Sequence, residues 1–304
     1  MKRRAFLQST TAATSLLALG GLGLSSFATA SSTKKITILH TNDVHSHIDP
    51  FLPTDGTNAN KGGVARRATL IDTIRKENPN TLLLDAGDIF QGTPYFNFYG
   101  GELEFKLMSK LKYDAATIGN HDFDNGIDGL YAQLPHADFP FLIANYDFSN
   151  TIMDTHTKPY KVFVKDGIKI GVFGVGIQLE GLVDPALYKE TVYRDPIETA
   201  QDMSRVLKEQ EQCDLVICLS HLGYNYSYPD KPSDLKMAAA TKDIDLIIGG
   251  HTHTFLTKPT VVKNSIGENM LVNQVGCYGI NLGRIDFYFD TDKNKAANGK
   301  SIIV

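Results

Sequence analysis

The sequence predicts an α/β fold in which many strands pair in parallel. Two observations support this: strand-like apolar runs alternate with segments of helical spacing, and most of the apolar runs end in polar residues. No internal repeat, low-complexity linker or charge block divides the chain. We therefore expect one folded domain after the N-terminal segment, covering residues 31–304.

The elements follow one another in a regular order. Residues 35–47 and 81–88 each begin with a strand-like pattern and end in polar residues. Further apolar runs occupy residues 139–146, 160–167, 168–175, 214–224, 243–255, 271–276 and 282–289. Helical spacing covers 62–77, 102–113 and 196–212. The Asp166-Gly167 pair predicts a tight hairpin turn between the two runs that flank it.

Composition excludes several classes of protein. The 304 residues are 42% hydrophobic and 21% charged, which argues against a disordered, collagen-like or disulfide-scaffold protein. A formal net charge of −4 gives no sign of a basic face for a nucleic acid polymer. Past the N-terminus no run of about 18 apolar residues predicts a membrane span. Three cysteines cannot form a complete disulfide framework.

Residues 1–30 have the pattern of an export signal. Lys2, Arg3 and Arg4 precede an apolar stretch, and Ala28-Thr29-Ala30 supplies small residues for cleavage before Ser31. The Arg3-Arg4 pair resembles a twin-arginine signal, with a general secretory signal as the alternative. Both interpretations predict a protein located in the periplasm or outside the cell.

Histidines gather where the predicted strands end. Five of the nine follow apolar runs, and two aspartates and an asparagine occupy the same kind of position: His45, His121, His221, His251 and His253, with Asp43, Asp88 and Asn120. In open α/β sheets, sites form at the carboxyl ends of strands. We therefore expect these side chains to meet in one cleft.

The residue types in this set are suited to metal binding. In an extended backbone, the i, i+2 spacing of Asp43 with His45, and of His251 with His253, would bring both members of each pair to a common centre. Carboxylate, imidazole and amide ligands without a thiolate favour Mn²⁺, Zn²⁺, Fe²⁺ or Co²⁺ over a structural zinc site. There are too many ligands for one tetrahedral ion, which predicts two ions that share a carboxylate.

The ordered runs DVHSH, GDIFQGT, GNHDFDNG, SHLGY and GGHTHTF resemble the calcineurin-like metallophosphoesterases. LHTND, DAGDIFQGTP and GNHDFDNG are most similar to the catalytic domain of the 5′-nucleotidase branch. The resemblance covers essentially all of residues 31–304. It implies a four-layer α-β-β-α sandwich with a dimetal site at the carboxyl ends of the strands.

The resemblance also implies a role for each of these residues. One ion would be held by Asp43, His45, Asp88 and His253, and the second by Asp88, Asn120, His221 and His251. His121 would be the catalytic histidine near the leaving-group oxygen, and Asp124 would orient it. His47 is expected beside the ligands rather than among them, and Tyr224, Tyr226 and Tyr228 are expected to line the substrate cleft.

The implied activity is metal-dependent hydrolysis of a small phosphoester, with a nucleotide as the expected substrate. Two adjacent cations lower the pKa of a shared water, and the resulting hydroxide attacks phosphorus. His121 as an imidazolium would protonate the departing oxygen. No serine lies in the context of a nucleophile, so no covalent intermediate is expected.

The family's two-domain members carry a C-terminal domain that clamps the base. This chain ends at residue 304, in GKSIIV, which resembles an interrupted strand, so we expect that clamp to be absent. Several alternatives stay open on sequence alone: a cyclic nucleotide, a nucleotide-sugar pyrophosphate or a sulfur ester as substrate, or a non-catalytic or truncated metal-binding protein. The oligomeric state is not predicted.

Overall fold

A computed structural model describes residues 33–304, which form one compact unit. The predicted export signal lies outside the described residues. Within them, no helix is long and apolar enough to cross a membrane.

The first of two main sheets has five strands in the order β13-β12-β1-β2-β3. Their bounds are β1 Lys34–Thr41, β2 Thr81–Asp85, β3 Ala115–Ala116, β12 Asn281–Phe289 and β13 Lys295–Ile303. β1, β2 and β3 run parallel, whereas β12 and β13 add an antiparallel edge. The carboxyl ends of the three parallel strands therefore lie at the same edge of this sheet.

The second sheet has six strands in the order β10-β11-β9-β8-β6-β5. Their bounds are β5 Tyr160–Lys165, β6 Ile168–Val175, β8 Leu215–Ser220, β9 Leu246–Gly249, β10 Thr260–Lys263 and β11 Asn269–Asn273. The four central strands β6, β8, β9 and β11 are parallel, and β5 and β10 are antiparallel edges. The parallel pairing predicted from the sequence is confirmed in both sheets.

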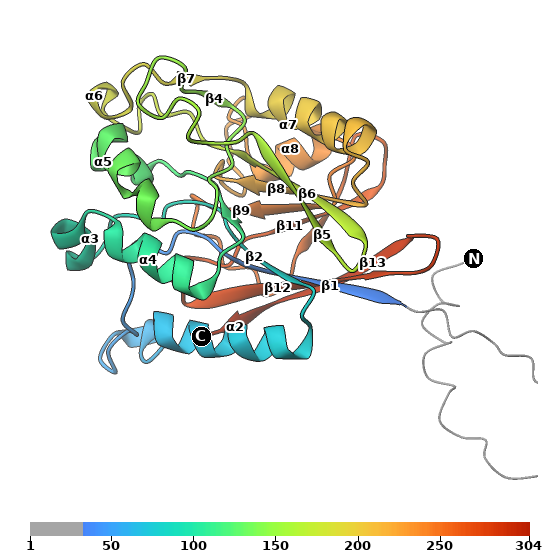
Figure 1. The fold of residues 1–304 in the computed structure, drawn as a ribbon, viewed down its shortest axis with the longest axis horizontal. Coiled ribbons are helices and arrows are strands. Elements are labelled where there is room, and N and C mark those ends of the chain that lie inside the picture. Colours follow the sequence, from blue (N-terminus) through green and yellow to red (C-terminus); the bar gives the residue numbers. More distant parts are fainter. Residues whose placement is uncertain (1–32) are drawn as a thin grey trace, which may run out of the picture. The chain divides into compact units, whose positions relative to one another are not determined.

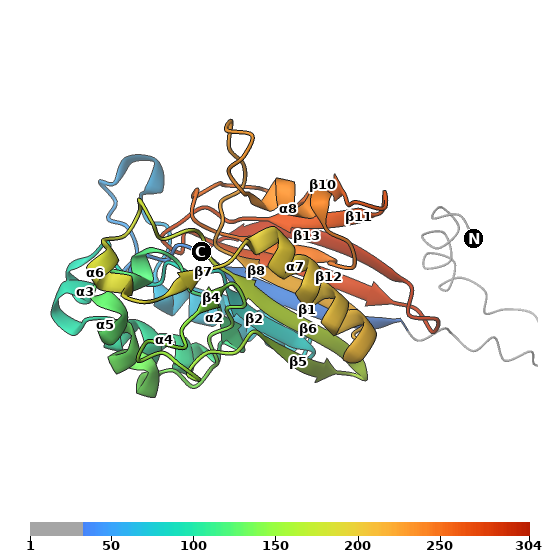
Figure 2. The same cartoon turned by 90° about the horizontal axis from the view of Figure 1, so that it is seen from above.

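Seven α-helices lie among the described residues, and most of them cover the outer faces of the sheets. They are α2 Val64–Glu77, α3 Pro94–Tyr99, α4 Glu102–Leu111, α5 Gly126–Gln133, α6 Pro185–Tyr188, α7 Pro196–Arg205 and α8 Asp234–Ala240. Shorter elements are η1 Gly56–Asn58, η2 His121–Phe123, η3 Leu134–His136, the π-helical η4 Val206–Gln210 and the strand pair β4 Tyr146–Asp147 and β7 Val192–Tyr193. α2 and α4 pack on the first sheet, and α7 and α8 pack on the second (Figure 1). Figure 2 shows α7 lying over β6 and β8.

Alternating side chains on the strands build three buried layers. In β2, Leu82 and Leu84 face the space between the sheets, while Leu83 faces the helices. In β8, Ile217 faces the inter-sheet space and Val216 faces α7 and α8. A strand buried on both faces is apolar at consecutive positions, which explains runs such as TLLL and LVICL. Three apolar interfaces separate four layers, so the α-β-β-α sandwich is confirmed.

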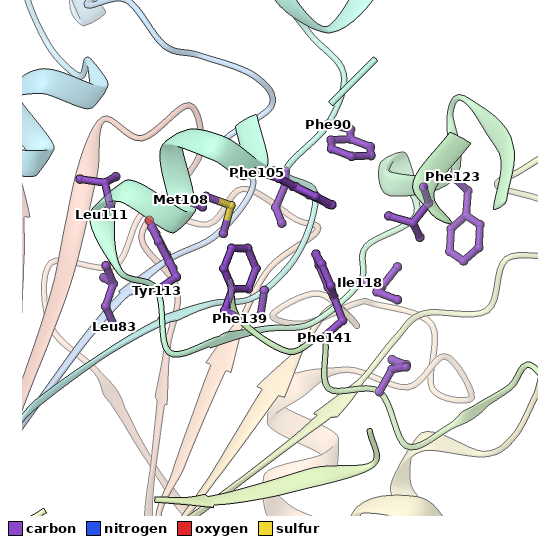
Figure 3. Packing of buried hydrophobic residues seen from close by; sticks show 14 of the residues in the cluster. Leu83, Phe90, Phe105, Met108, Leu111, Tyr113, Ile118, Phe123, Phe139 and Phe141 are labelled. Carbon is purple, nitrogen blue, oxygen red and sulfur yellow. The ribbon is translucent and has the colours of Figure 1, made fainter. Parts of the chain in front are cut away.

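The layer between the first sheet and its helices is rich in aromatic side chains. Phe105 and Met108 of α4 lie against Phe139 and Phe141 from the segment after η3 (Figure 3). The rings of Phe105 and Phe141 lie 5.1 Å apart, within the range of favourable ring contacts. This packing fixes α4 and the loops around it next to the ends of β1 and β2.

Three local predictions are confirmed. The hairpin turns at Asp166 (φ +49°) and Gly167 (φ +73°), a pair of left-handed residues that suits the twist of β5 and β6. Helices begin and end close to where the spacing placed them at 62–77, 102–113 and 196–212, although η4 closes the last one. All three cysteines are buried and free, so the described residues contain no disulfide.

Two further segments complete the first sheet and its surroundings. Residues 139–146 form isolated bridges at Phe141 and Leu142 before β4, because this run fills the aromatic layer rather than extending a sheet. The final segment forms β13, which pairs with β12 over nine residue pairs.

Candidate metal centre

Every metal ligand predicted from the sequence lies in a loop that follows a parallel strand. Asp43 and His45 follow β1, and Asp88 follows β2. Asn120 follows β3, His221 follows β8 directly, and His251 and His253 follow β9. The two sheets thus deliver these side chains from their carboxyl ends to one place.

Backbone hydrogen bonds join the loops that carry these residues. The N–H groups of Asp43 and His45 donate to the carbonyls of Gly87 and Asp88, at 2.9 and 3.1 Å, which extends the pairing of β1 with β2 past the strands. The N–H of His251 donates to the carboxylate of Asp43, with the shorter distance 2.9 Å. Loops held in this way present their side chains at fixed separations.

The backbone at five of these positions is left-handed. The residues are Asp43 (φ +49°), His45 (φ +49°), Asp88 (φ +55°), His251 (φ +71°) and His253 (φ +50°). Aspartate and histidine tolerate this region better than most residues, but it still costs about 1–2 kcal/mol for each. The prediction that Asp43 with His45, and His251 with His253, lie on extended backbone is therefore wrong.

Three of the side chains form a first cluster, Asp43, His45 and His253, whose ligand atoms lie within 4.8 Å of one another. His45 Nε2 lies 3.0 Å from His253 Nε2 and 4.0 Å from Asp43 Oδ1. His45 Nδ1–H donates to the Phe90 carbonyl at 3.1 Å, which leaves its Nε2 lone pair free for the cluster centre.

A second cluster contains Asp88, His221 and His251. His221 Nε2 lies 3.0 Å from Asp88 Oδ2, and His221 Nδ1–H donates to the Ala86 carbonyl at 2.7 Å. Asn120 Oδ1 lies 2.8 Å from His251 Nδ1 and so belongs to the same group of side chains. His251 and His253 thus fall in different clusters, the division that the family resemblance implies, whereas their spacing alone suggested a common centre.

Asp88 lies between the two clusters. Its Oδ2 is 3.8 Å from His45 Nε2 in the first cluster and 3.0 Å from His221 Nε2 in the second. A side chain at position 119 would overlap Asp88 Oδ1, so the close approach requires Gly119. Asp88 therefore borders both clusters.

The electrostatics of this site favour positive charge at its centre. Burial opposes a charge on His221, yet the Asp88 carboxylate raises its pKa to about 10. The interaction with Asp43 raises the pKa of His253 to about 10. Burial and the nearby His221 lower the pKa of His251 to about 4. The two buried carboxylates therefore demand a compensating charge, which protons on imidazole or bound cations supply.

The donor set fits a pair of divalent cations. His221 Nε2 is fully buried and lies 3.0 Å from Asp88 Oδ2, but no contact within residues 33–304 gives it hydrogen-bond geometry. A buried ring nitrogen that lies close to a carboxylate without hydrogen-bond geometry is the arrangement expected of two ligands of one ion. Imidazole, carboxylate and amide oxygen together suit borderline ions such as Mn²⁺, Zn²⁺, Fe²⁺ and Co²⁺.

His121 and Asp124 form a pair beside the clusters. His121 Nδ1 lies 3.0 Å from Asp124 Oδ2, and the His121 ring lies 5.3 Å from the His45 ring. The hydrogen bond to Asp124 raises the pKa of His121. Nδ1–H donation to Asp124 leaves Nε2 as the atom that can exchange a proton with a ligand.

A cavity of about 400 Å³ opens over the first cluster and His121. It is lined by His45, His47, Gln91, Gly92, His121, His253 and Tyr278. The tyrosines of the GYNYSYPD segment are not among these residues. Tyr224 and Tyr226 use their hydroxyls in hydrogen bonds to Thr260 and Leu222, and Tyr228 is 71% exposed.

Sequence reasoning missed two residues of this region. Asp122 accepts hydrogen bonds from the N–H groups of Asp88, Ile89, Phe90 and Gly119, and thereby holds the Asp88 loop. Tyr278 lies at the cavity wall in a left-handed conformation (φ +60°) between Cys277 and Gly279. Both residues have a signal in the sequence that points to the site. Asp122 directly follows the Asn120-His121 pair, and Tyr278 lies in the glycine-containing segment Gly276–Gly279.

A family model described as calcineurin-like phosphoesterase matches residues 36–255. The chain belongs to this family. The match begins in β1 and ends just after His253, so it contains both clusters and the His121–Asp124 pair. Family membership agrees with the two candidate metal clusters that the structure shows.

Relatives within the family include named nucleotidases. The chain is 36% identical over 287 residues to the trifunctional nucleotide phosphoesterase protein YfkN of Bacillus subtilis, over 84% of the chain and 18% of that protein. It is 35% identical over 286 residues to a snake venom 5′-nucleotidase of Crotalus adamanteus, over 87% of the chain and 47% of the relative. The chain therefore spans less than half of either relative.

One solved structure has the same fold, and its sequence is about as similar to this chain as those of the two relatives above. The structure of a 5′-nucleotidase precursor from Thermus thermophilus matches with a TM-score of 0.80 and 34% identity. The match covers 89% of this chain and 55% of that one. The predicted resemblance to the catalytic domain of the 5′-nucleotidase branch is confirmed.

Proposed function

We propose that this chain hydrolyses small phosphate monoesters with two divalent cations, and that nucleotides are its main substrates. The observation that carries this proposal is the position of Asp88, which lies between two metal-suited clusters and also accepts the backbone N–H of His121 at 2.8 Å. One carboxylate thus links both clusters to a candidate proton donor. A protein that only binds metal has no need of that link.

Each cluster would hold one ion. Asp43, His45, Asp88 and His253 would bind the first, and Asp88, Asn120, His221 and His251 the second. When bound, a pair of divalent cations activates a water and neutralises the phosphoryl oxygens. The residues themselves supply ligands from loops that are already held in place by hydrogen bonds, so little reorganisation is needed on binding.

His121 would act on the leaving group. Its ring lines the cavity, and Asp124 holds Nδ1, so Nε2 is available to donate a proton to the oxygen that departs from phosphorus. Asp124 also favours the charged imidazolium that such a donor requires. A proton donor of this kind contributes about 10²–10⁴ in rate.

A substrate panel tests this function. The full chain would be assayed with and without Mn²⁺, Zn²⁺ and Co²⁺ for the product of each ester. These products are phosphate from AMP and from p-nitrophenyl phosphate, UMP from UDP-glucose, and the nucleoside monophosphate from a cyclic nucleotide. We expect metal-dependent turnover that is fastest with AMP, and turnover of AMP that falls by about 10²–10⁴ in His121→Ala. His156→Ala is the matched control, because His156 is exposed and lies outside the cavity.

The outcomes separate the alternatives. Faster turnover of the cyclic nucleotide or of UDP-glucose would keep the site but change the substrate class. Binding of two metals with no turnover of any ester would contradict the enzymatic function and favour a metal-binding protein.

The proposed enzyme acts outside the cytoplasm. Support comes from residues 1–30, whose basic start, apolar stretch and Ala28-Thr29-Ala30 sequence follow the pattern of an export signal. Changing both Arg3 and Arg4 to Lys is expected to block export if the twin-arginine route is used. Unchanged export of that variant would contradict the twin-arginine interpretation and favour the general secretory route.

A further inference from the structure

Three aromatic side chains form a continuous surface beside the metal clusters. We call His47, Phe51 and Tyr278 the aromatic wall. The His47 ring lies 4.2 Å from the Tyr278 ring and 5.2 Å from the Phe51 ring, with an angle of 23° between the planes of His47 and Phe51. These separations are typical of ring contacts, so the wall is packed within itself.

The aromatic wall extends outward from the first cluster. The Tyr278 ring lies 5.8 Å from the His253 ring and 5.9 Å from the His45 ring. Tyr278 and His47 line the same cavity as His121. A phosphate ester bound at the clusters, with its leaving group near His121, would therefore place that group in a space bordered by the wall.

Tyr278 is held in an unfavourable backbone conformation. Its φ of +60° is rare for a bulky aromatic residue. The N–H of Tyr278 donates to the carbonyl of Asp43 at 2.7 Å, which ties this position to a metal-binding loop. Strain of this kind persists where the surroundings enforce it, and it gathers at ligand-binding positions.

His47 and Phe51 are also held in place. His47 Nδ1–H donates to the carbonyl of His45 at 3.0 Å. The backbone of Phe51 exchanges hydrogen bonds with the segment from Asn60 to Lys61, at 3.1 and 2.9 Å. The aromatic wall is therefore fixed before any ligand arrives, and little ordering is required on binding.

We propose that the aromatic wall binds the leaving group of the ester by stacking against a planar ring, such as a nucleobase. This inference rests on the proposed function, because it concerns the group attached to the phosphate. Rings of every base have a face that can stack, so the wall would favour an aromatic leaving group without selecting one base. Tyr278, nearest the clusters, would make the main contact.

The test compares two substrates that share one leaving oxygen. AMP and ribose 5-phosphate release phosphate from the same 5′ carbon, but only AMP carries a ring. The full chain is expected to show kcat/KM for AMP about tenfold or more above that for ribose 5-phosphate, in keeping with the usual gain from one stacked base. Most of this difference is expected in KM.

Three variants identify the ring responsible. Tyr278→Asn removes the ring, and asparagine tolerates the left-handed backbone. We expect this variant to have a ratio of kcat/KM for AMP to kcat/KM for ribose 5-phosphate close to one. Tyr278→Phe keeps the ring and should keep the preference. Tyr228→Asn is the matched control, because Tyr228 is exposed and lies outside the cavity.

A binding measurement separates this inference from the proposed function. Saturation-transfer NMR would report contact between the adenine protons of adenosine and the protein, with no need for turnover. Adenine signals in the wild type and in Tyr278→Phe, but not in Tyr278→Asn, support the aromatic wall even if no ester is hydrolysed.

Two results would overturn the inference. Equal kcat/KM for AMP and ribose 5-phosphate in the wild type would leave the hydrolase in place but contradict ring stacking. If no ester is hydrolysed, the absence of adenine signals in the wild type would contradict it as well.

Discussion

The carboxylate of Asp88 accepts a hydrogen bond from the backbone N–H of His121, with 2.8 Å between Oδ1 and nitrogen. The other oxygen, Oδ2, faces His221 and His45. One side chain thus sets the distance between the metal clusters and the candidate proton donor. Substitution of Asp88 is therefore expected to affect metal binding, whereas substitution of His121 is expected to affect only proton donation.

His121→Ala is expected to lower kcat according to the leaving group. Loss of the proton donor should reduce turnover of AMP by about 10²–10⁴, because its alkoxide leaves poorly without a proton. The reduction for p-nitrophenyl phosphate should be much smaller, because nitrophenolate needs no proton to depart. Steady-state kinetics on both substrates check this, with bound metal measured in parallel. Equal losses on the two substrates would contradict the role as a proton donor.

Asp88→Ala is expected to impair both metal clusters, whereas single histidine substitutions should impair one. After dialysis against Mn²⁺, Asp88→Ala should retain fewer than one ion per chain, and His253→Ala and His251→Ala about one each. Elemental analysis by mass spectrometry provides the count. Retention of two ions by Asp88→Ala would show that this carboxylate does not bridge.

Asp122→Asn is expected to destabilise the fold itself. The carboxylate accepts four backbone N–H groups, and an amide has one oxygen to offer them. Leaving buried donors unpaired should cost about 3 kcal/mol. Urea unfolding in the presence of EDTA measures this loss without a contribution from metal. Asp154→Asn, at an exposed position, is the control, and equal stability of the two variants would refute the prediction.

His40 is expected to make stability fall in mild acid. Burial in β1 lowers the pKa of His40 to about 3, and its Nε2 accepts a hydrogen bond from the Asn273 side chain at 2.8 Å. The unfolded chain binds this proton near pH 6.5, so the folded state loses stability as the pH falls from about 6.5 toward 3.

The size of this effect can be measured directly. Between pH 7 and pH 5 the wild type should lose about 2 kcal/mol more than His40→Gln, which does not titrate. Urea unfolding with EDTA at both pH values gives the comparison. The same pH dependence in both proteins would exclude His40 as the cause.

Much of the fold could be predicted because its elements are encoded locally. The consecutive apolar residues of β2 and β8 are buried on both faces, and Asp166-Gly167 adopts the turn that its residue types favour. The assignment of strands to two separate sheets depends on contacts distant in sequence. Residue patterns predicted parallel pairing, but the four layers were predicted from the family resemblance.

The site was predictable in its residue types but not in its local geometry. Histidine and aspartate at strand ends are visible in the sequence, whereas the left-handed backbone at Asp43 and His251 is not, because hydrogen bonds from other loops impose it. The i, i+2 spacing alone did not separate His251 from His253, whereas the family resemblance implied that they belong to different ions. Tyr278 was missed because its place in the cavity depends on a hydrogen bond to the Asp43 loop.

The central claim is that two cations on this chain are required for phosphate release. The most direct measurement is the initial rate of release from AMP as Mn²⁺ is titrated into metal-free protein, with bound metal counted at each step. We predict no release without metal and a rate that reaches its maximum at about two ions per chain. Full activity in metal-free protein, or a maximum at one bound ion, would contradict the account.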